Sequence, residues 1–188
     1  MLSAERTALN LLARLSGIAT ATRDIVAAVS SFPARIVCTR KTTPGLRALE
    51  KYAVRAGGGS NHRFGLDDAV LVKDNHRVIA GGLTAAVNHV RGRIGHMVQV
   101  EVEVDTLQEL EEALRLGVDA VLFDNMPLED LARAVSMAKG KVITEASGGI
   151  TPANVAAIAA TGVDLISLGW ITHSAPALDV SLDLALRV

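Results

Sequence analysis

Cysteine and aromatic side chains are scarce in this sequence of 188 residues. Cys38 is the only cysteine, which excludes an intrachain disulfide and any zinc site built from several cysteines. A lone cysteine is typical of a reducing compartment, so we expect a cytoplasmic protein. Aromatic residues make up only 3% of the chain, and few stacking platforms for single-stranded nucleic acid are therefore present.

An excess of one charge and a long apolar run are lacking too. The 19 basic and 20 acidic residues give a net charge of -1, so no overall field draws the chain to nucleic acid or to an anionic membrane. No window approaches the roughly 20 apolar residues that span a bilayer, and the N-terminus has no signal-peptide pattern. We expect neither nucleic acid nor a membrane as partner.

The hydrophobic content of 49% is enough for one compact domain with its own core. Apolar residues from Leu2 to Val29 follow mostly helical spacings, with Gly17 as an expected break, and predict a helical segment over residues 1–34. Short β-rich runs and helical patterns then alternate. The runs cover residues 36–39, 69–73, 97–104, 119–124, 141–145 and 164–168, and the helical patterns cover 46–56, 83–90, 107–116, 128–138 and 153–160.

This alternation predicts an α/β fold over residues 35–188, with parallel strands covered by helices. The strand runs are apolar without strict alternation, as buried parallel strands are. We expect a six-stranded, partly open (β/α) barrel of the TIM-like type, preceded by the helical segment. Because a full barrel of this type has about eight strands, a doubly wound open sheet is the alternative.

Cationic side chains follow the first two predicted strands. Arg40 and Lys41 come after the first, Lys73 ends the second, and His62 and Arg63 lie in the loop between them. Each of these residues taken singly is commonly a solvated surface group. Ligands bind at the carboxyl ends of parallel strands, so the cluster predicts a site for an anion there.

Carboxylates and glycines follow the later strands. Glu103 and Asp124 lie on or after the third and fourth, while Ser147-Gly148 and Gly169 follow the fifth and sixth. Glycines let a phosphate approach backbone N–H groups closely, and a following helix N-terminus adds partial positive charge. The layout predicts a small polyanion held beside a sugar phosphate whose hydroxyls, or a metal ion, meet the two carboxylates.

A series of longer motifs occurs in order along nearly the whole chain. They are Glu5–Asn10, Ser16–Thr20, Thr39–Arg47, Gly58–Arg63, Leu71–His76, Val100–Val104, Phe123–Met126, Glu145–Ile150 and Leu178–Asp183. Together they resemble the motifs of the quinolinate phosphoribosyltransferases, also called nicotinate-nucleotide pyrophosphorylases (carboxylating). The resemblance implies a pentosyl (glycosyl) transferase of de novo NAD biosynthesis. Its reaction would join quinolinate to phosphoribosyl pyrophosphate and release nicotinate mononucleotide, pyrophosphate and carbon dioxide, with Mg²⁺ as cofactor.

The resemblance also implies roles for individual residues. Arg40, His62, Arg63 and Lys73 would hold the two carboxylates of quinolinate. Lys41 would face the pyrophosphate, while Glu103 and Asp124 would bind ribose hydroxyls directly or through Mg²⁺. The remaining substrate-binding residues would be Ser147, Gly148 and Gly169 at the 5-phosphate, together with His173.

A homodimer is implied as well, with Arg6 reaching the active site of a neighbouring subunit. The resemblance implies that members of the family carry an additional N-terminal α/β domain that covers the partner's site. We expect this domain to be absent here and substrate closure to be impaired. One alternative is a catalytically incomplete barrel that binds without turnover. Another is a molybdenum-transport-associated relative that binds a different anionic ligand, although the set formed by Arg40, His62, Arg63 and Lys73 favours a dicarboxylate.

Overall fold

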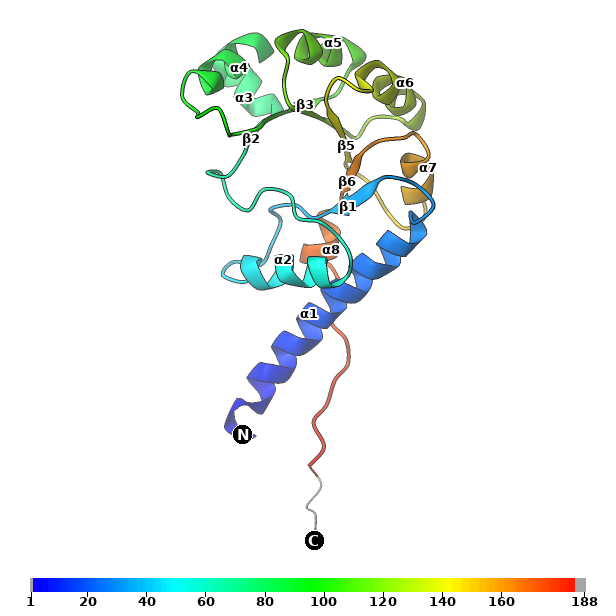
Figure 1. Ribbon diagram of the computed structural model, residues 1–188. Helices are drawn as coiled ribbons and strands as arrows, with labels where there is room; N and C mark the ends of the chain where they lie inside the picture. The colour runs from blue at the N-terminus through cyan, green and yellow to red at the C-terminus, as the bar shows by residue number, and fades with distance from the viewer. Residues whose placement is uncertain (1, 185–188) are drawn as a thin grey trace.

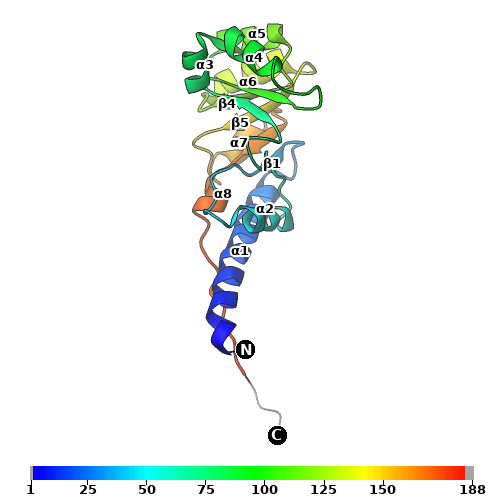
Figure 2. The same ribbon diagram turned by 90° about the vertical axis from the view of Figure 1, so that its left-hand side faces the viewer.

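The first element of the computed structural model, which describes residues 2–184, is helix α1 (Leu2–Ala28). It projects from the rest of the molecule (Figures 1 and 2). The expected break at Gly17 is wrong, because α1 is continuous through that residue. A Cβ atom at Gly17 would lie 2.0 Å from the carbonyl oxygen of Pro176. The glycine therefore makes room for the C-terminal segment that passes along α1.

Six parallel strands form one curved sheet (Figure 1). They are β1 (Arg35–Val37), β2 (Val70–Val72), β3 (Val100–Val104), β4 (Ala120–Asp124), β5 (Ile143–Ser147) and β6 (Leu165–Ser167). Their spatial order is β1-β6-β5-β4-β3-β2, which is the order of a barrel opened between β1 and β2. The predicted partly open barrel is confirmed. A doubly wound sheet would instead reverse its strand order at a switch point.

The helices lie in two groups (Figure 1). Helices α3 to α7 cover the convex side of the sheet, while α2 and α8 pack with α1 near the open side. The sequence does not predict α3 or α8. The bounds are α2 (Arg47–Ala56), α3 (Asp74–Ala80), α4 (Leu83–Arg91), α5 (Leu107–Leu116), α6 (Leu128–Ala138), α7 (Val155–Ala159) and α8 (Trp170–His173). No helix in residues 2–184 has the length and apolar character needed to cross a membrane.

The strand register separates apolar from polar side chains. On β3, Val102 and Val104 belong to the core cluster, whereas the intervening Glu103 lines the interior of the barrel. Glu103 pairs with Leu122, and Leu122 with Glu145, so all three lie at one level of the sheet. Because side chains alternate along a strand, one face packs under the helices and the other builds a polar interior.

Candidate active site

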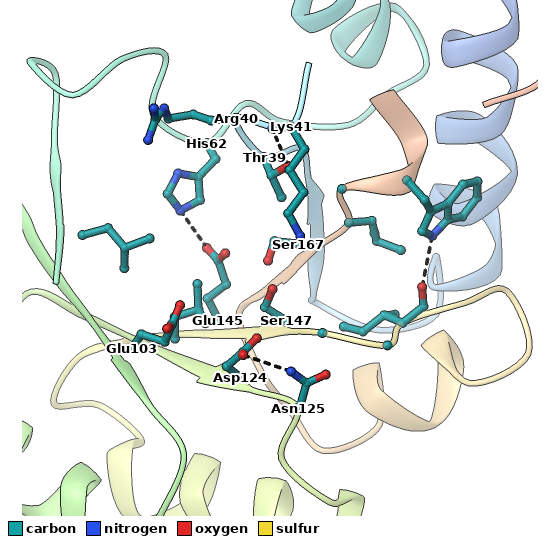
Figure 3. A pocket seen from close by; sticks show the side chains of 18 of the residues that line it. Thr39, Arg40, Lys41, His62, Glu103, Asp124, Asn125, Glu145, Ser147 and Ser167 are labelled. Atoms are coloured by element: carbon teal, nitrogen blue, oxygen red, sulfur yellow. Dashed lines mark hydrogen bonds and ion pairs between the residues drawn. The ribbon is translucent and has the colours of Figure 1, made fainter. Parts of the chain in front are cut away.

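One large cavity lies at the carboxyl ends of the strands (Figure 3). Its volume is about 920 Å³. Every residue that the sequence predicts for the site lines this cavity, with the exception of Arg6. Those residues are Arg40, Lys41, His62, Arg63, Lys73, Glu103, Asp124, Ser147, Gly148, Gly169 and His173. Segments far apart in the sequence therefore meet where the fold of parallel strands predicts a ligand.

Arg40 and Arg63 form the most basic part of the cavity. Burial, and then the neighbouring Arg40, hold the pKa of Arg63 below its ordinary value. The Nε atom of Arg40 is buried and has no hydrogen-bond partner among residues 2–184. Nη1 of Arg63 donates to the carbonyl oxygen of Ala69 at 3.0 Å, which orients that side chain. Two guanidinium groups that repel each other are stabilised by an anionic ligand beside them.

The carboxylates Glu103 and Asp124 form an acidic part beside it. Glu103 is 6% exposed and makes an ion pair with Lys73. Burial, and then repulsion from Glu103, raise the pKa of Asp124, and Nδ2 of Asn125 donates to its Oδ2 at 2.9 Å. The sequence suggests Lys73 as a carboxylate-holding cation. In the structure its ammonium group lies between the basic and acidic parts of the cavity and pairs with Glu103.

The two glycine loops meet on the far side of the cavity. Gly148 has φ 87°, and a Cβ atom there would lie 2.2 Å from Oδ1 of Asn125. Nε1 of Trp170 donates to the carbonyl oxygen of Ile150 at 3.0 Å and so ties the loop after β5 to the loop after β6. A Cβ atom at Gly169 would lie 2.9 Å from Cδ of Lys41. Both loops therefore require glycine for close approach.

Sequence reasoning missed Glu145, which lines the cavity beside the predicted His62. Nε2 of His62 lies 3.0 Å from Oε2 of Glu101 and 3.5 Å from Oε2 of Glu145. Glu145 lines the cavity and is only 1% exposed. A usable signal was present, because Glu145 stands two residues before Ser147 and so on the same face of β5. Further lining residues outside the prediction include Thr39, Asn125, Gly149, Ser167 and Trp170.

Arg6 lies elsewhere. It is an exposed residue near the beginning of α1, on the part of the helix that projects from the barrel (Figure 1). It is not among the residues that line the cavity. The predicted role of Arg6 in a neighbouring subunit stays a prediction.

Glu103 and Asp124 offer ligand atoms for a metal ion, and a second group of acidic and histidine side chains lies close together. Within residues 2–184, His62, Glu101 and Glu145 are the one group of three whose potential ligand atoms all lie within 4.8 Å of one another. Glu103 and Asp124, the pair predicted from the sequence, supply two carboxylates that repel each other across the cavity. Carboxylate oxygens are the ligands that Mg²⁺ prefers.

Comparison with known families decides the relationship of the chain. The family described as "Quinolinate phosphoribosyl transferase, C-terminal domain" matches residues 18–183. The chain belongs to the quinolinate phosphoribosyl transferase family. A member from Bacillus subtilis (strain 168), named probable nicotinate-nucleotide pyrophosphorylase (carboxylating), is 50% identical over 186 residues. The human nicotinate-nucleotide pyrophosphorylase (carboxylating) is 44% identical over 189 residues.

Coverage is nearly complete in one direction only. The match with the Bacillus subtilis member covers 99% of this chain and 64% of the relative, and the human match covers 98% and 64%. This chain thus spans just under two thirds of the length of these family members. The resemblance read from the motifs is confirmed.

Solved structures of the family share the fold. The nicotinate-nucleotide pyrophosphorylase from Ehrlichia chaffeensis superposes with a TM-score of 0.94 at 43% identity, covering 97% of this chain and 66% of its own. The enzyme of the same name from Francisella tularensis gives a TM-score of 0.92 at 48% identity, covering 96% and 64%. This chain therefore shares its fold with these two proteins over nearly its whole length.

Proposed function

We propose that this chain carries out phosphoribosyl transfer from phosphoribosyl pyrophosphate to quinolinate with decarboxylation. The products would be nicotinate mononucleotide, pyrophosphate and carbon dioxide, as a step of de novo NAD biosynthesis. One observation supports this most strongly: a single cavity holds two arginines, the carboxylates of Glu103 and Asp124, and two glycine loops. The names of relatives such as the Bacillus subtilis and human proteins describe the same chemistry for those proteins.

The basic part of the cavity would bind the dicarboxylate. Arg40 has a buried Nε atom that finds no hydrogen-bond partner among the described residues, and Arg63 carries a charge that burial and Arg40 destabilise. Carboxylates of the substrate would give Arg40 a hydrogen-bond partner and would stabilise the charge of Arg63. Charge-assisted hydrogen bonds to arginine also fix the orientation of the ligand. Lys73, already paired with Glu103, would bind a carboxylate of quinolinate beside the sugar.

The acidic part would stabilise the sugar. As pyrophosphate departs, positive charge grows on the ribose ring, and fixed carboxylates beside it lower the free energy of the transition state. Glu103 and Asp124 would bind the ribose hydroxyls, and the loops at Ser147-Gly148 and Gly169 would bind the 5-phosphate. Lys41, whose carbonyl oxygen accepts a hydrogen bond of 2.8 Å from Thr172, would face the pyrophosphate.

Magnesium fits the same two carboxylates. Both supply hard oxygen ligands, and the raised pKa of Asp124, caused by burial and then by Glu103, indicates that a cation between them would be favourable. Glu103 and Asp124 would hold the ion. When bound, it would supply positive charge to the phosphate oxygens of the leaving group.

Decarboxylation requires little further chemistry from the chain. Once the pyridine nitrogen carries the ribose, its positive charge stabilises the electron pair that the departing carbon dioxide leaves on the adjacent ring carbon. A proton from solvent then bonds to that carbon in place of the carboxylate, so no protein nucleophile is needed. The side chains would chiefly hold the two substrates in line, and such positioning alone lowers the barrier substantially.

We also propose a cytoplasmic homodimer in which Arg6 of the partner subunit reaches the cavity. The single buried Cys38 is compatible with a reducing compartment. An exposed Arg6 on the projecting part of α1 is available to a second copy of the chain.

The test is formation of nicotinate mononucleotide by the purified protein with quinolinate, phosphoribosyl pyrophosphate and Mg²⁺, followed chromatographically. We expect product from the wild type and from Lys139→Ala, an exposed-lysine control at the end of α6, and a strong loss in Lys73→Ala. Quinolinate binding without product would support the catalytically incomplete barrel instead. Absence of both binding and product would overturn the proposal.

A further inference from the structure

The cluster of His62, Glu101 and Glu145 has more acceptor atoms than hydrogen-bond donors. Two carboxylates face one ring nitrogen, Nε2 of His62, at 3.0 Å and 3.5 Å. Oε1 of Glu145 is buried and has no hydrogen-bond partner in the described part of the chain. The side chain lines the cavity, below the basic residues (Figure 3). A buried oxygen without a partner costs free energy unless a ligand or a proton satisfies it.

The other side of the imidazole fixes its tautomer. The backbone N–H of Arg63 donates to Nδ1 of His62 at 2.8 Å, so Nδ1 carries no hydrogen and Nε2 does. Nζ of the buried Lys51 donates to the carbonyl oxygen of His62 at 2.8 Å and holds the backbone. Since a hydrogen occupies Nε2, that atom donates to the carboxylates and is not available as a metal ligand.

A second proton has two possible positions in this cluster. It can protonate His62 at Nδ1, or it can protonate a carboxylate, and the net charge of the cluster is the same in both cases. Protonation of Nδ1 would break the hydrogen bond from Arg63. Of the two carboxylates, Glu145 is the more buried, at 1% exposed against 9% for Glu101. The proton therefore belongs on Glu145.

The titration of the cluster agrees with this assignment. Burial, and then repulsion from Glu101, raise the pKa of Glu145 to about 7. Burial lowers the pKa of His62, but the hydrogen bond to Glu101 and the charges of both carboxylates raise it by more. Both shifts describe one shared proton. The Arg63 amide decides where it sits.

Charged groups on the neighbouring elements do not reverse this balance. His62, Ser167 and Lys73 lower the pKa of Glu145, each more weakly than burial and Glu101 raise it. On the outer face of β5, the packed helix α6 carries its charged residues at exposed or half-buried positions. The other charged and titratable side chains that line the cavity are Arg40, Lys41, Arg63, Glu103, Asp124 and His173.

We propose that Glu145 is a substrate-binding carboxylic acid, which is uncharged when the dicarboxylate is bound and donates a hydrogen bond from Oε1–H to one of its carboxylates. This rests on the proposed function, because it takes a pyridine dicarboxylate as the ligand. An ionised Glu145 would repel such a ligand. Binding must then be accompanied by uptake of a proton wherever free Glu145 is ionised.

The proposal predicts the direction in which quinolinate affinity changes with pH. The anionic ligand raises the pKa of Glu145 above its value in the free protein, so quinolinate affinity is greatest below about pH 7 and falls as the pH rises above it. One coupled proton gives a fall of up to about tenfold per pH unit. Both quinolinate carboxyl groups are already ionised in this range, so the ligand itself contributes no change.

The experiment is calorimetric titration of the full chain with quinolinate at pH 6.5 and 8.5, in buffers of different ionisation enthalpy, which yields the number of protons taken up. For the wild type we expect proton uptake at pH 8.5 and an affinity that is about tenfold or more weaker there than at pH 6.5. Glu145→Gln keeps a neutral donor, so it should take up no proton through this site and bind equally at both pH values. Glu145→Met, of similar size but without a donor, should bind about tenfold more weakly than wild type at pH 6.5.

The outcomes separate this inference from the proposed function. Wild-type binding with no proton uptake, or with the same pH dependence in Glu145→Gln, would overturn the role of Glu145 and leave the function intact. Failure of the wild type to bind quinolinate at either pH would overturn the proposed function and the inference with it. Infrared spectra of the ligand-free protein give an independent check, since a protonated-carboxyl C=O band at neutral pH should disappear in Glu145→Gln.

Discussion

The two halves of the cavity carry opposite charges, and each half is destabilised by its own like-charged neighbours. In the basic half, burial and Arg40 lower the pKa of Arg63. In the acidic half, burial and Glu103 raise the pKa of Asp124. Lys73 lies between the halves as the partner of Glu103. The comparison teaches that each half is prepared for a ligand of opposite charge, which relieves repulsion already present in the free protein.

The largest expected effect concerns the acidic half. Glu103→Gln removes a negative charge that we assign to the ribose side, so kcat should fall by on the order of a hundredfold or more. Quinolinate affinity should change far less, because the arginines remain. Steady-state kinetics and calorimetric titration measure the two quantities, with the exposed Glu111→Gln on α5 as control. Wild-type turnover in Glu103→Gln would remove this residue from the site.

The basic half should respond in the opposite way. Arg40→Ala removes a guanidinium assigned to a carboxylate, which should weaken quinolinate binding by roughly thirtyfold, or about 2 kcal/mol. Arg35→Ala serves as the matched control, because Arg35 begins β1 at the opposite end of the strand and is exposed. Titration with quinolinate tests both variants. Equal affinities would contradict the assignment of Arg40.

Two glycines test whether the loop assigned to the 5-phosphate requires its close backbone approach. Gly148 and Gly140 both have left-handed backbone conformations, with φ 87° and φ 73°. A Cβ atom at Gly148 would clash with Asn125, whereas one at Gly140 meets no atom within 4 Å. Gly140→Ala should therefore lower the free energy of unfolding by about 1–2 kcal/mol, and Gly148→Ala by more. Urea denaturation measures both free energies of unfolding. Equal decreases in the two variants would show that the close approach of Gly148 to Asn125 does not affect stability.

The smallest expected effect is on stability and depends on pH. The folded-state pKa of Asp124 is raised, so its ionisation disfavours the folded state, and stability is lost as the pH rises through that pKa. Asp124→Asn should therefore raise the free energy of unfolding of the ligand-free protein at pH 7. The gain should disappear below the ordinary aspartate pKa of about 3.9. A gain that is the same at acid and neutral pH would point to another cause.

The sequence predicts the main α/β elements because their apolar periods are strong. Helix α3 escapes prediction since none of its residues is buried, and it therefore has no apolar face to read. The predicted helix break at Gly17 is wrong for a different reason. This glycine makes room for the carbonyl group of Pro176, a contact that no local sequence pattern reveals. Tertiary contacts thus decide the elements that periodicity cannot.

The candidate site was predictable to the extent that strand ends converge. Arg40, Lys73 and Asp124 could be placed together because parallel strands end at one edge. The pairing of Lys73 with Glu103, and the meeting of His62 with Glu145, depend on side-chain directions between elements distant in the sequence. The Ser147-Gly148 motif predicts phosphate binding, but nothing in that motif indicates that the side chain of Glu145, two residues earlier, also lines the cavity.

The most direct test is a crystal structure with quinolinate and a non-reactive phosphoribosyl pyrophosphate analogue bound together. The two-half account predicts the pyridine carboxylates at Arg40 and Arg63, the ribose beside Glu103 and Asp124, and the 5-phosphate at the Ser147-Gly148 loop. Carboxylates bound at the glycine loops, or a sugar that touches neither Glu103 nor Asp124, would contradict it.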